Sequence, residues 1–327
     1  MNIRLTAIVL ATCVLVAACG QEAPAPTVPA PGKPAVAKAP APSPHAMPTE
    51  ATTKSLAKDH STIRYRVYGS GEPAIVLIHG WSCDSGYWDS QLDDLAVQHT
   101  VVTLDLAGHG KSDAKKRKDW SMANFGADVA AVVNAVGTPR VVLVGHSMGG
   151  PVALEAARLL RGKVIGIVGV DTFRDITHPF PKEATNALLK AMHDDFAKAT
   201  RDLVDKNFFT DRTDPIIRKW IVKDMSSAPP KVAIPALKSL VAMDYGPVLN
   251  ELDLPIVAIN ADPPPTDEAA TRRIEPRFRV VSVAGAGHFL MIEKPSQFNA
   301  MLRRILDAWA GLQNKPPVPL SDPTPTR

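Results

Sequence analysis

One short segment in the middle of the chain constrains the fold more than any other. A run of β-branched and aliphatic residues at 141–144 is followed at once by the pattern Gly-x-Ser-x-Gly at 145–149, and then by helix-forming residues at 153–160. This order predicts a buried strand, a sharp turn and a helix. Gly145 and Gly149 suit such a turn, because bulkier residues two positions either side of Ser147 would collide with the strained backbone.

A serine held at this kind of turn is suited to act as a nucleophile. Because serine is a poor nucleophile at its own pKa, it needs a neutral imidazole to take its proton and a carboxylate to hold that imidazole's tautomer. The first amides of the next helix, with the positive end of the helix dipole, suit a developing oxyanion. Ser147 is therefore the candidate nucleophile.

The rest of the central sequence alternates apolar runs with helical stretches. Such alternation predicts an α/β protein with a mostly parallel, doubly wound sheet, in which ligands bind beyond the carboxyl ends of the strands. A shorter strand near Leu56 is compatible with the pattern. The main predicted strands are Thr62–Tyr68 at an edge, Ala74–Ile78, Thr100–Leu104, Arg140–Val144, Val164–Val170, Pro255–Ile259 and Arg279–Val283.

Several motifs in the same order resemble those of the α/β-hydrolase fold superfamily, in its serine-nucleophile, esterase- and lipase-like branch. They are His79-Gly80-Trp81 with Trp88 downstream, Asp105-Leu106-Ala107-Gly108-His109-Gly110-Lys111-Ser112, Gly145-His146-Ser147-Met148-Gly149-Gly150 and Gly285-Ala286-Gly287-His288-Phe289. The resemblance covers nearly the whole body and implies a helical cap after the sixth strand, at about 173–252. Helical patterning is seen there at Glu183–Leu203, Asp214–Met225 and Pro235–Ala242. One departure is Ala107, where relatives often carry proline.

His288 is the best candidate for the base. It lies in a glycine-rich loop after the last predicted strand, which agrees with the order serine, acid, histidine of this fold. His79 and His109 follow earlier strands, and we expect them to make structural hydrogen bonds within turns. His146 occupies the variable position of the serine motif and is expected to pack near the start of the helix.

The acid is not fixed by a motif, because the Gly-x-x-Asp that relatives carry is replaced here by residues 260–267. We favour Asp262, which ends the penultimate strand, the usual position for the acid. Asp171, at the end of Val164–Val170, is the alternative, because some relatives carry their acid after that earlier strand. Asp267 is the weaker choice, since Thr266-Asp267-Glu268 is typical of a helix start.

The resemblance also implies an oxyanion hole built from backbone amides. The two amides are those of Trp81, just after His79-Gly80, and Met148, just after the nucleophile. Only the backbone of these residues matters for the chemistry. The Trp81 ring is expected to form pocket wall or core.

The hypothesis that joins these features is a serine hydrolase that cleaves a carboxylic ester or a similar small acyl compound through an acyl-serine intermediate, with no metal and no organic cofactor. Acyl transfer and cofactor-free perhydrolysis are alternatives with the same triad, and amide or lactone cleavage stays open. A catalytically inactive binding module of the cell envelope is a further alternative.

The 37 basic and 33 acidic residues are interspersed, which argues against a nucleic-acid partner. The oligomeric state is not predicted.

The N-terminus reads as a targeting segment. Residues 1–18 contain Arg4 and then an apolar stretch that is short for a membrane span of about 20 residues, and the segment resembles a bacterial lipoprotein signal ending before Cys19. We expect a lipidated Cys19, a disordered Pro/Ala-rich tether over 19–52, a hydrolase domain over 53–313 and a disordered Pro-rich tail over 314–327. Gly20 after the cysteine favours the outer membrane by resemblance, so a lipid-anchored protein of the cell envelope is expected. Cys83 would then be the one thiol left in the body.

Overall fold

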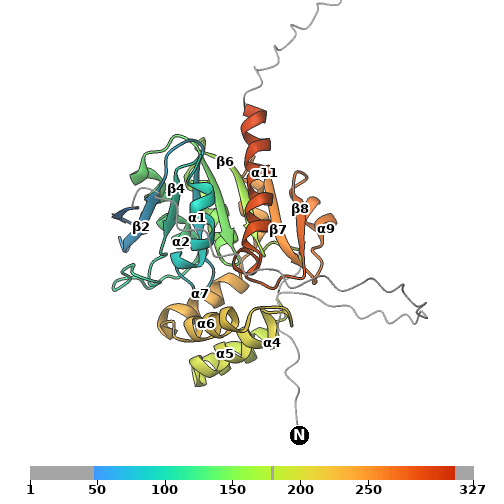
Figure 1. Cartoon of the computed structure of the whole chain (residues 1–327). Helices are drawn as coiled ribbons and strands as arrows, with labels where there is room; N and C mark the ends of the chain where they lie inside the picture. The colour runs from blue at the N-terminus through green and yellow to red at the C-terminus, as the bar shows by residue number, and fades with distance from the viewer. Residues whose placement is uncertain (1–47, 178–179, 314–327) are drawn as a thin grey trace, which may run out of the picture.

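The computed structural model describes residues 48–177 and 180–313 of the 327-residue chain. The strands are β1 (Thr49–Lys54), β2 (Thr62–Tyr68), β3 (Ala74–Ile78), β4 (Val101–Leu104), β5 (Val141–His146), β6 (Val164–Val170), β7 (Ile256–Asp262) and β8 (Arg279–Ala284). They form one eight-stranded sheet in the order β1-β2-β4-β3-β5-β6-β7-β8 (Figure 1). Pairing is antiparallel from β1 to β4 at one edge and parallel elsewhere. The predicted mostly parallel sheet is confirmed.

Helices flank both faces of this sheet. Helix α2 begins after Ser121, whose hydroxyl accepts a hydrogen bond from the amide of Asn124, and ends at Gly137, which adopts a left-handed φ of 76°. The flanking helices are η1 (Ser85–Trp88), α1 (Asp89–Leu95), α2 (Met122–Val136), α3 (Gly149–Leu159), α9 (Glu268–Arg272), α10 (Leu290–Glu293) and α11 (Pro295–Gln313). Helices α2 and α3 pack on each other, and α1 packs on α11.

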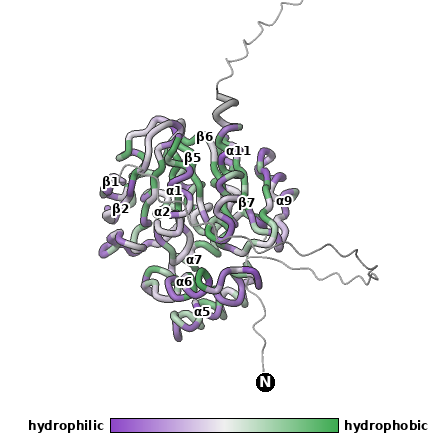
Figure 2. The backbone as a smooth tube through the Cα atoms, in the orientation of Figure 1, coloured by the Kyte–Doolittle hydropathy of each residue, from purple (hydrophilic) through white to green (hydrophobic). Residues whose placement is uncertain are grey.

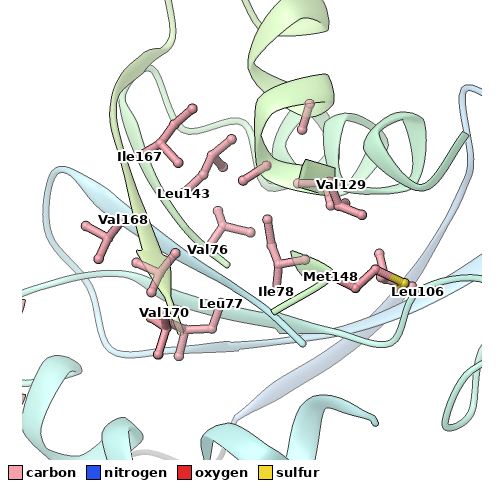
Figure 3. Packing of buried hydrophobic residues seen from close by; sticks show 14 of the residues in the cluster. Val76, Leu77, Ile78, Leu106, Val129, Leu143, Met148, Ile167, Val168 and Val170 are labelled. Atoms are coloured by element: carbon pink, nitrogen blue, oxygen red, sulfur yellow. The ribbon is translucent and has the colours of Figure 1, made fainter. Parts of the chain in front are cut away.

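The core lies along the central strands, which are buried on both faces because helices cover both. Ile78 and Leu143 lie on the side of Val129 from α2, whereas Leu77 and Val170 lie on the opposite face (Figure 3). Full burial of each such aliphatic side chain contributes roughly 1.5–3 kcal/mol to folding. Figure 2 shows the hydrophobic stretches concentrated on β5 and β6 and hydrophilic ones toward the periphery. β5, which leads into the candidate nucleophile Ser147, is thus fixed in the middle of the core.

A helical cap follows β6, the sixth strand, as expected. Its helices are α4 (Lys182–Asp194), α5 (Phe196–Asn207), α6 (Pro215–Ser226), α7 (Pro230–Val241) and α8 (Tyr245–Asn250). In Figure 1 helices α4 to α7 gather below one end of the sheet. The predicted helix Glu183–Leu203 is two helices, because Asp195 leaves the helical conformation and its side chain caps α5 by accepting from the amide of Lys198. Helix α7 starts earlier than predicted and contains Pro235.

The N-terminal boundary differs from the prediction. The tether was expected to run to residue 52, but Thr49–Lys54 forms β1, which pairs along its whole length with β2. The sequence of this edge strand is polar and its side chains are mostly exposed, so it lacks the apolar alternation that identifies buried strands.

The expected signal, Cys19, most of the tether and the tail at 314–327 lie outside the described residues. Within the described part of the chain, no helix combines the length and apolar character needed to cross a membrane.

Candidate active site

Ser147 lies at the turn between β5 and α3, as the sequence predicts. Its φ is 51°, a left-handed value that side chains other than glycine adopt at a cost. A Cβ on Gly145 would lie 2.1 Å from the carbonyl oxygen of Gly149, and a Cβ on Gly149 would lie 2.4 Å from that of Ile78. Both glycines are therefore required by the close approach of backbone to backbone around the serine.

His288 lies in the loop after β8 and is oriented by a carboxylate. Its Nδ1 donates a hydrogen bond to Oδ2 of Asp171 over 2.6 Å. Because a carboxylate oxygen accepts hydrogen bonds, Nδ1 carries a proton, and in the neutral form of the imidazole the lone pair is then on Nε2. Both side chains are largely buried, with 9% and 6% of their surface exposed. Ser147 and His288 line the same cavity.

The structure brings Asp171, and not the favoured Asp262, into contact with His288. Asp262 is exposed at the end of β7, whereas the carboxylate that contacts His288 is that of Asp171, directly after β6. The reason is the strand order, in which β6 is the neighbour of β5 and β7 lies one strand further from the nucleophile. The amide of Ser147 donates to the carbonyl of Val170 over 2.9 Å, so the end of β6 adjoins the serine directly. The alternative acid of the sequence analysis therefore has the required position.

The second oxygen of Asp171 is held by the neighbouring strand and by an arginine. Oδ1 accepts from the amide of Ala261 over 2.9 Å and from the guanidinium of Arg174, which also donates to the carbonyls of Ala261 and Pro264. Burial raises the pKa of Asp171, but the hydrogen bond from His288 and the charges of His288 and Arg174 outweigh it and hold the pKa below its ordinary value. Sequence reasoning missed Arg174. The sequence contains one signal for it, because a buried carboxylate needs a cation and Arg174 lies three positions after Asp171.

The peptide groups on both sides of the His288 side chain are also anchored. Nε2 of His146 donates to the carbonyl of His288 over 3.0 Å, and the amide of His288 donates to the carbonyl of Phe208 over 2.8 Å. The ring of Phe208 lies 4.4 Å from that of His288, centroid to centroid. Burial, with the nearby charge of His288, lowers the pKa of His146 to about 3, so its imidazole is neutral. His146 was expected only to pack near the helix start, and its contact with His288 is new.

The two residues whose amides are predicted to form the oxyanion hole are buried. Met148 is fully buried at the start of α3, and Trp81 is 4% exposed. Among the described residues, neither amide donates a hydrogen bond to a protein acceptor. Both amides can therefore donate to an oxygen of a bound ligand. The indole of Trp81 donates instead to the carbonyl of Ala233 in α7 over 2.7 Å, which makes this ring a contact between the sheet and the cap.

The other histidines near the site have structural partners, as predicted. Nδ1 of His79 donates to the carbonyl of Gly80 over 2.8 Å, and its Nε2 accepts from the amide of Leu106 over 3.0 Å. Nδ1 of His109 donates to the carbonyl of Ala107 over 3.2 Å, and burial lowers the pKa of His109 to about 3. These contacts hold the loop after β4.

Ala107, the residue at which relatives often carry proline, has a specific contact. Its amide donates to Oδ2 of Asp128 over 3.1 Å, a bond that proline could not make. Asp128 in turn pairs with the fully buried side chain of Arg117 over 2.7 Å. Alanine at this position therefore links the loop to a buried ion pair through its amide. Proline would instead make the loop rigid.

The cavity beside Ser147 is apolar and is closed largely by the cap. Leucines of α4, α5 and α7, Met225 of α6, and Phe180 and Phe208 supply most of the wall, with Trp81 and Cys83 on the side of the sheet. Within the described residues the lining contains no lysine, arginine, aspartate or glutamate. Nor do three or more histidine, cysteine or acidic side chains of residues 48–177 and 180–313 converge where they could hold a metal ion.

Comparison with known proteins supports this assignment of the fold. A non-heme haloperoxidase from Rhodococcus erythropolis is 31% identical over 221 residues, which covers 63% of this chain and 80% of the relative. An uncharacterized protein of Mycobacterium tuberculosis is 43% identical over 93 residues, and this chain spans only 27% of that relative's length. A thermophilic esterase from Thermogutta terrifontis has the same fold, with a TM-score of 0.68 at 22% identity over 80% of this chain and 99% of that one. Residues 75–301 match the model of the alpha/beta hydrolase family, and the chain therefore belongs to that family.

Proposed function

We propose that this hydrolase cleaves a carboxylic ester through an acyl-serine intermediate. The observation that carries the proposal is that Ser147 and His288 line one cavity while Nδ1 of His288 is fixed on Asp171 at 2.6 Å. In the neutral imidazole that arrangement puts the lone pair on Nε2, on the side away from Asp171. A serine hydroxyl, a neutral imidazole and an ionised acid are the three groups that covalent acyl transfer requires.

In the proposed reaction, Nε2 of His288 takes the proton of Ser147 as Oγ attacks the carbonyl carbon of the ester. The negative charge that develops on the carbonyl oxygen is stabilised by the amides of Trp81 and Met148. The tetrahedral intermediate then expels the alcohol, which receives the proton from Nε2. Water, activated by the same imidazole, attacks the acyl-serine and releases the carboxylic acid. Asp171 stabilises the imidazolium in both halves without taking its proton.

The lining of the cavity supports an uncharged substrate with an apolar acyl group. Burying a carboxylate there without a cationic partner would cost several kcal/mol, because the described lining offers none. Leu188, Leu237 and Met225 can instead pack against methylene groups, each of which contributes about 0.8 kcal/mol when buried.

The test is a survey of p-nitrophenyl esters with the purified protein. We expect p-nitrophenyl butyrate to be hydrolysed with at least 100-fold higher kcat/KM than the p-nitrophenyl monoester of succinate, which has a similar length and a terminal charge. Ser147→Ala should abolish both hydrolysis and labelling by a fluorophosphonate while the circular dichroism spectrum stays unchanged. Full activity in that variant would rule out the serine mechanism, and equal rates with the two esters would rule out the apolar acyl site.

A second candidate reaction is cofactor-free perhydrolysis, in which hydrogen peroxide replaces water in the attack on the acyl-serine. The observation that favours it is the 31% identity to a non-heme haloperoxidase over 80% of that relative. Adding hydrogen peroxide and acetate and measuring peracetic acid would separate this reaction from simple hydrolysis. Ser147→Ala should abolish both activities, because both use the same acyl-serine.

We also propose that Cys19 carries a lipid that anchors the protein in the cell envelope, at the outer membrane. The basis is the sequence alone, with an apolar segment that ends in small residues before the cysteine. The Pro/Ala-rich segment that follows would hold the hydrolase domain away from the lipid surface.

A further inference from the structure

One carboxylate connects the loop that carries His288 to the cap. Oε1 of Glu293, at the end of α10, accepts from the amide of Gly287 over 3.1 Å. Oε2 of the same residue accepts from the hydroxyl of Thr213 over 2.6 Å. Gly287 immediately precedes His288, and Thr213 lies between cap helices α5 and α6. Glu293 therefore contacts the sheet domain's histidine loop with one oxygen and the cap with the other.

The cap segment at this contact is itself fixed. The amide of Thr213 donates to the carbonyl of Thr210 over 3.1 Å, and the amide of Thr210 donates to the hydroxyl of Thr213 over 3.1 Å. Thr213 is buried. The same segment starts at Phe208, whose carbonyl accepts from the amide of His288 over 2.8 Å. The turn thus holds two adjacent peptide groups of the histidine loop, one directly and one through Glu293.

The fit between loop and cap is tight at Gly287. A Cβ at this position would lie 2.5 Å from the carbonyl oxygen of Phe208 and 2.8 Å from Oε1 of Glu293. Glycine is therefore needed for close approach, and little movement of the loop is possible while both partners are in place. Removal of Glu293 would open space on one side and leave the amide of Gly287 without its acceptor.

We propose that Glu293 is a positioning residue, which locks the His288 loop to the cap so that docking of the cap and placement of the imidazole occur together. The proposal depends on the proposed function in one respect, that His288 is the general base. Displacement of a catalytic group by about 1 Å can reduce turnover by about 100-fold. The cap would accordingly act on catalysis as well as on the shape of the acyl pocket.

The test compares two substitutions at one position. Glu293→Ala removes both acceptors, and we expect kcat for p-nitrophenyl butyrate to fall by about 100-fold with KM changed less than threefold. Glu293→Gln should keep activity within threefold, because its oxygen can accept from Gly287 and its amide can donate to the hydroxyl of Thr213. Asp253→Ala, which removes a carboxylate that is 98% exposed, is the control and should match the wild-type protein.

Fluorophosphonate labelling distinguishes positioning from loss of folded protein. In Glu293→Ala the labelling rate should fall while the final stoichiometry stays at one per chain, whereas partial unfolding would lower the stoichiometry. Thr213→Val is a second variant, for the case that Glu293→Ala does not fold. It removes the cap contact and leaves the contact with Gly287, and it should also lower kcat. Wild-type kcat in both variants would overturn the proposal, as would an equal loss in Glu293→Gln and Glu293→Ala.

Hydrogen exchange tests the contact without reference to activity. Amides of residues 285–290 and of residues 208–213 should both exchange faster in Glu293→Ala than in the wild-type protein, because one carboxylate holds both segments. Unchanged exchange in both segments would overturn the proposal even if the wild-type protein hydrolysed no ester. Conversely, a wild-type protein that neither hydrolyses esters nor reacts with the fluorophosphonate would contradict the proposed function, while faster exchange in the variant would still support the link.

Discussion

The carboxylate of Asp171 accepts a hydrogen bond from Nδ1 of His288 although the two residues are 117 positions apart in the sequence. The contact exists because β6 ends beside the nucleophile, where the carbonyl of Val170 accepts from the amide of Ser147. The loop after β8 places His288 next to the same end of β6. The proposed acid follows the strand next to that of Ser147, and the more distant β7 supports its carboxylate through the amide of Ala261.

The identity of the acid gives the first prediction. Asp171→Asn should lower turnover by about 10⁴-fold, because the amide group can donate to Nδ1 and so favour the tautomer in which Nε2 carries the proton. Asp262→Asn should retain near-normal turnover, since its side chain is exposed at the end of β7. Steady-state kinetics of the two variants provide the measurement. If Asp262→Asn loses activity and Asp171→Asn does not, the assignment from the structure is wrong.

The fold was largely predictable because its strands are buried on both faces. β3 consists of uninterrupted apolar residues and β5 begins with four of them, and the bounds of both strands agree with the prediction to within two residues. The first four residues of β1 fall in the predicted tether for the opposite reason, since an exposed edge strand needs only backbone partners and leaves no apolar pattern. The break at Asp195 was missed because a helix cap depends on one local hydrogen bond within a continuous helical composition.

The site was predictable where the chemistry is local and less so where it depends on strand order. Ser147 is defined by its own turn, and His288 by its loop. The choice between Asp171 and Asp262 required the knowledge of which strand adjoins β5, which no local pattern contains. The partners Arg174 and Glu293 were missed for a related reason, because the bonds from Arg174 to Ala261 and Pro264, and the bond between Glu293 and Thr213, join segments that are far apart in the sequence.

The second prediction concerns stability in mild acid. The pKa values of His109 and His146 are lowered by burial from 6.5 to about 3, so the folded protein stays unprotonated at these sites while the unfolded chain takes up protons below pH 6.5. Because the unfolded state binds more protons, stability is full above pH 6.5 and is lost as the pH falls toward 3. Together the two histidines should lower the free energy of unfolding by about 3–4 kcal/mol between pH 7 and pH 5.

Urea unfolding at pH 7, 6 and 5 provides the measurement. Most carboxylates keep their charge in this range, so the histidines dominate the change. His109→Gln should remove about half of the pH dependence that His109 and His146 contribute together, whatever its effect on absolute stability. A free energy of unfolding that stays constant from pH 7 to pH 5 would contradict the prediction.

The third prediction tests the anchor. Cys19→Ser should leave the chain either unprocessed or soluble in the periplasm, because the serine has no thiol to carry a lipid, and each buried methylene of the lipid contributes about 0.8 kcal/mol to membrane binding. Cell fractionation and mass spectrometry of the N-terminus are the measurements. Cys83→Ser is the control and should remain in the membrane fraction. Retention of Cys19→Ser in the membrane with a processed N-terminus would exclude the lipid anchor.

The last prediction concerns His146, which donates from Nε2 to the carbonyl of His288 over 3.0 Å. His146→Leu removes this donor and leaves a partly buried carbonyl unpaired, at a cost of up to about 3 kcal/mol, which the histidine loop can avoid only by moving. We expect kcat to fall by about tenfold or more. His146→Gln places an amide donor near the former Nε2 and should stay within a few-fold of the wild-type protein. His193→Leu, an exposed histidine at the end of α4, is the control and should have no effect.

The pH profile separates this positioning role from a role as a second base. Because the pKa of His146 lies at about 3, its imidazole does not change protonation between pH 6 and pH 9, and His146→Gln should keep the wild-type shape of kcat/KM against pH. A lost or shifted limb in that variant would mean that His146 itself exchanges protons during turnover. Equal losses in His146→Gln and His146→Leu would mean that the ring's shape, and not its hydrogen bond, holds the loop.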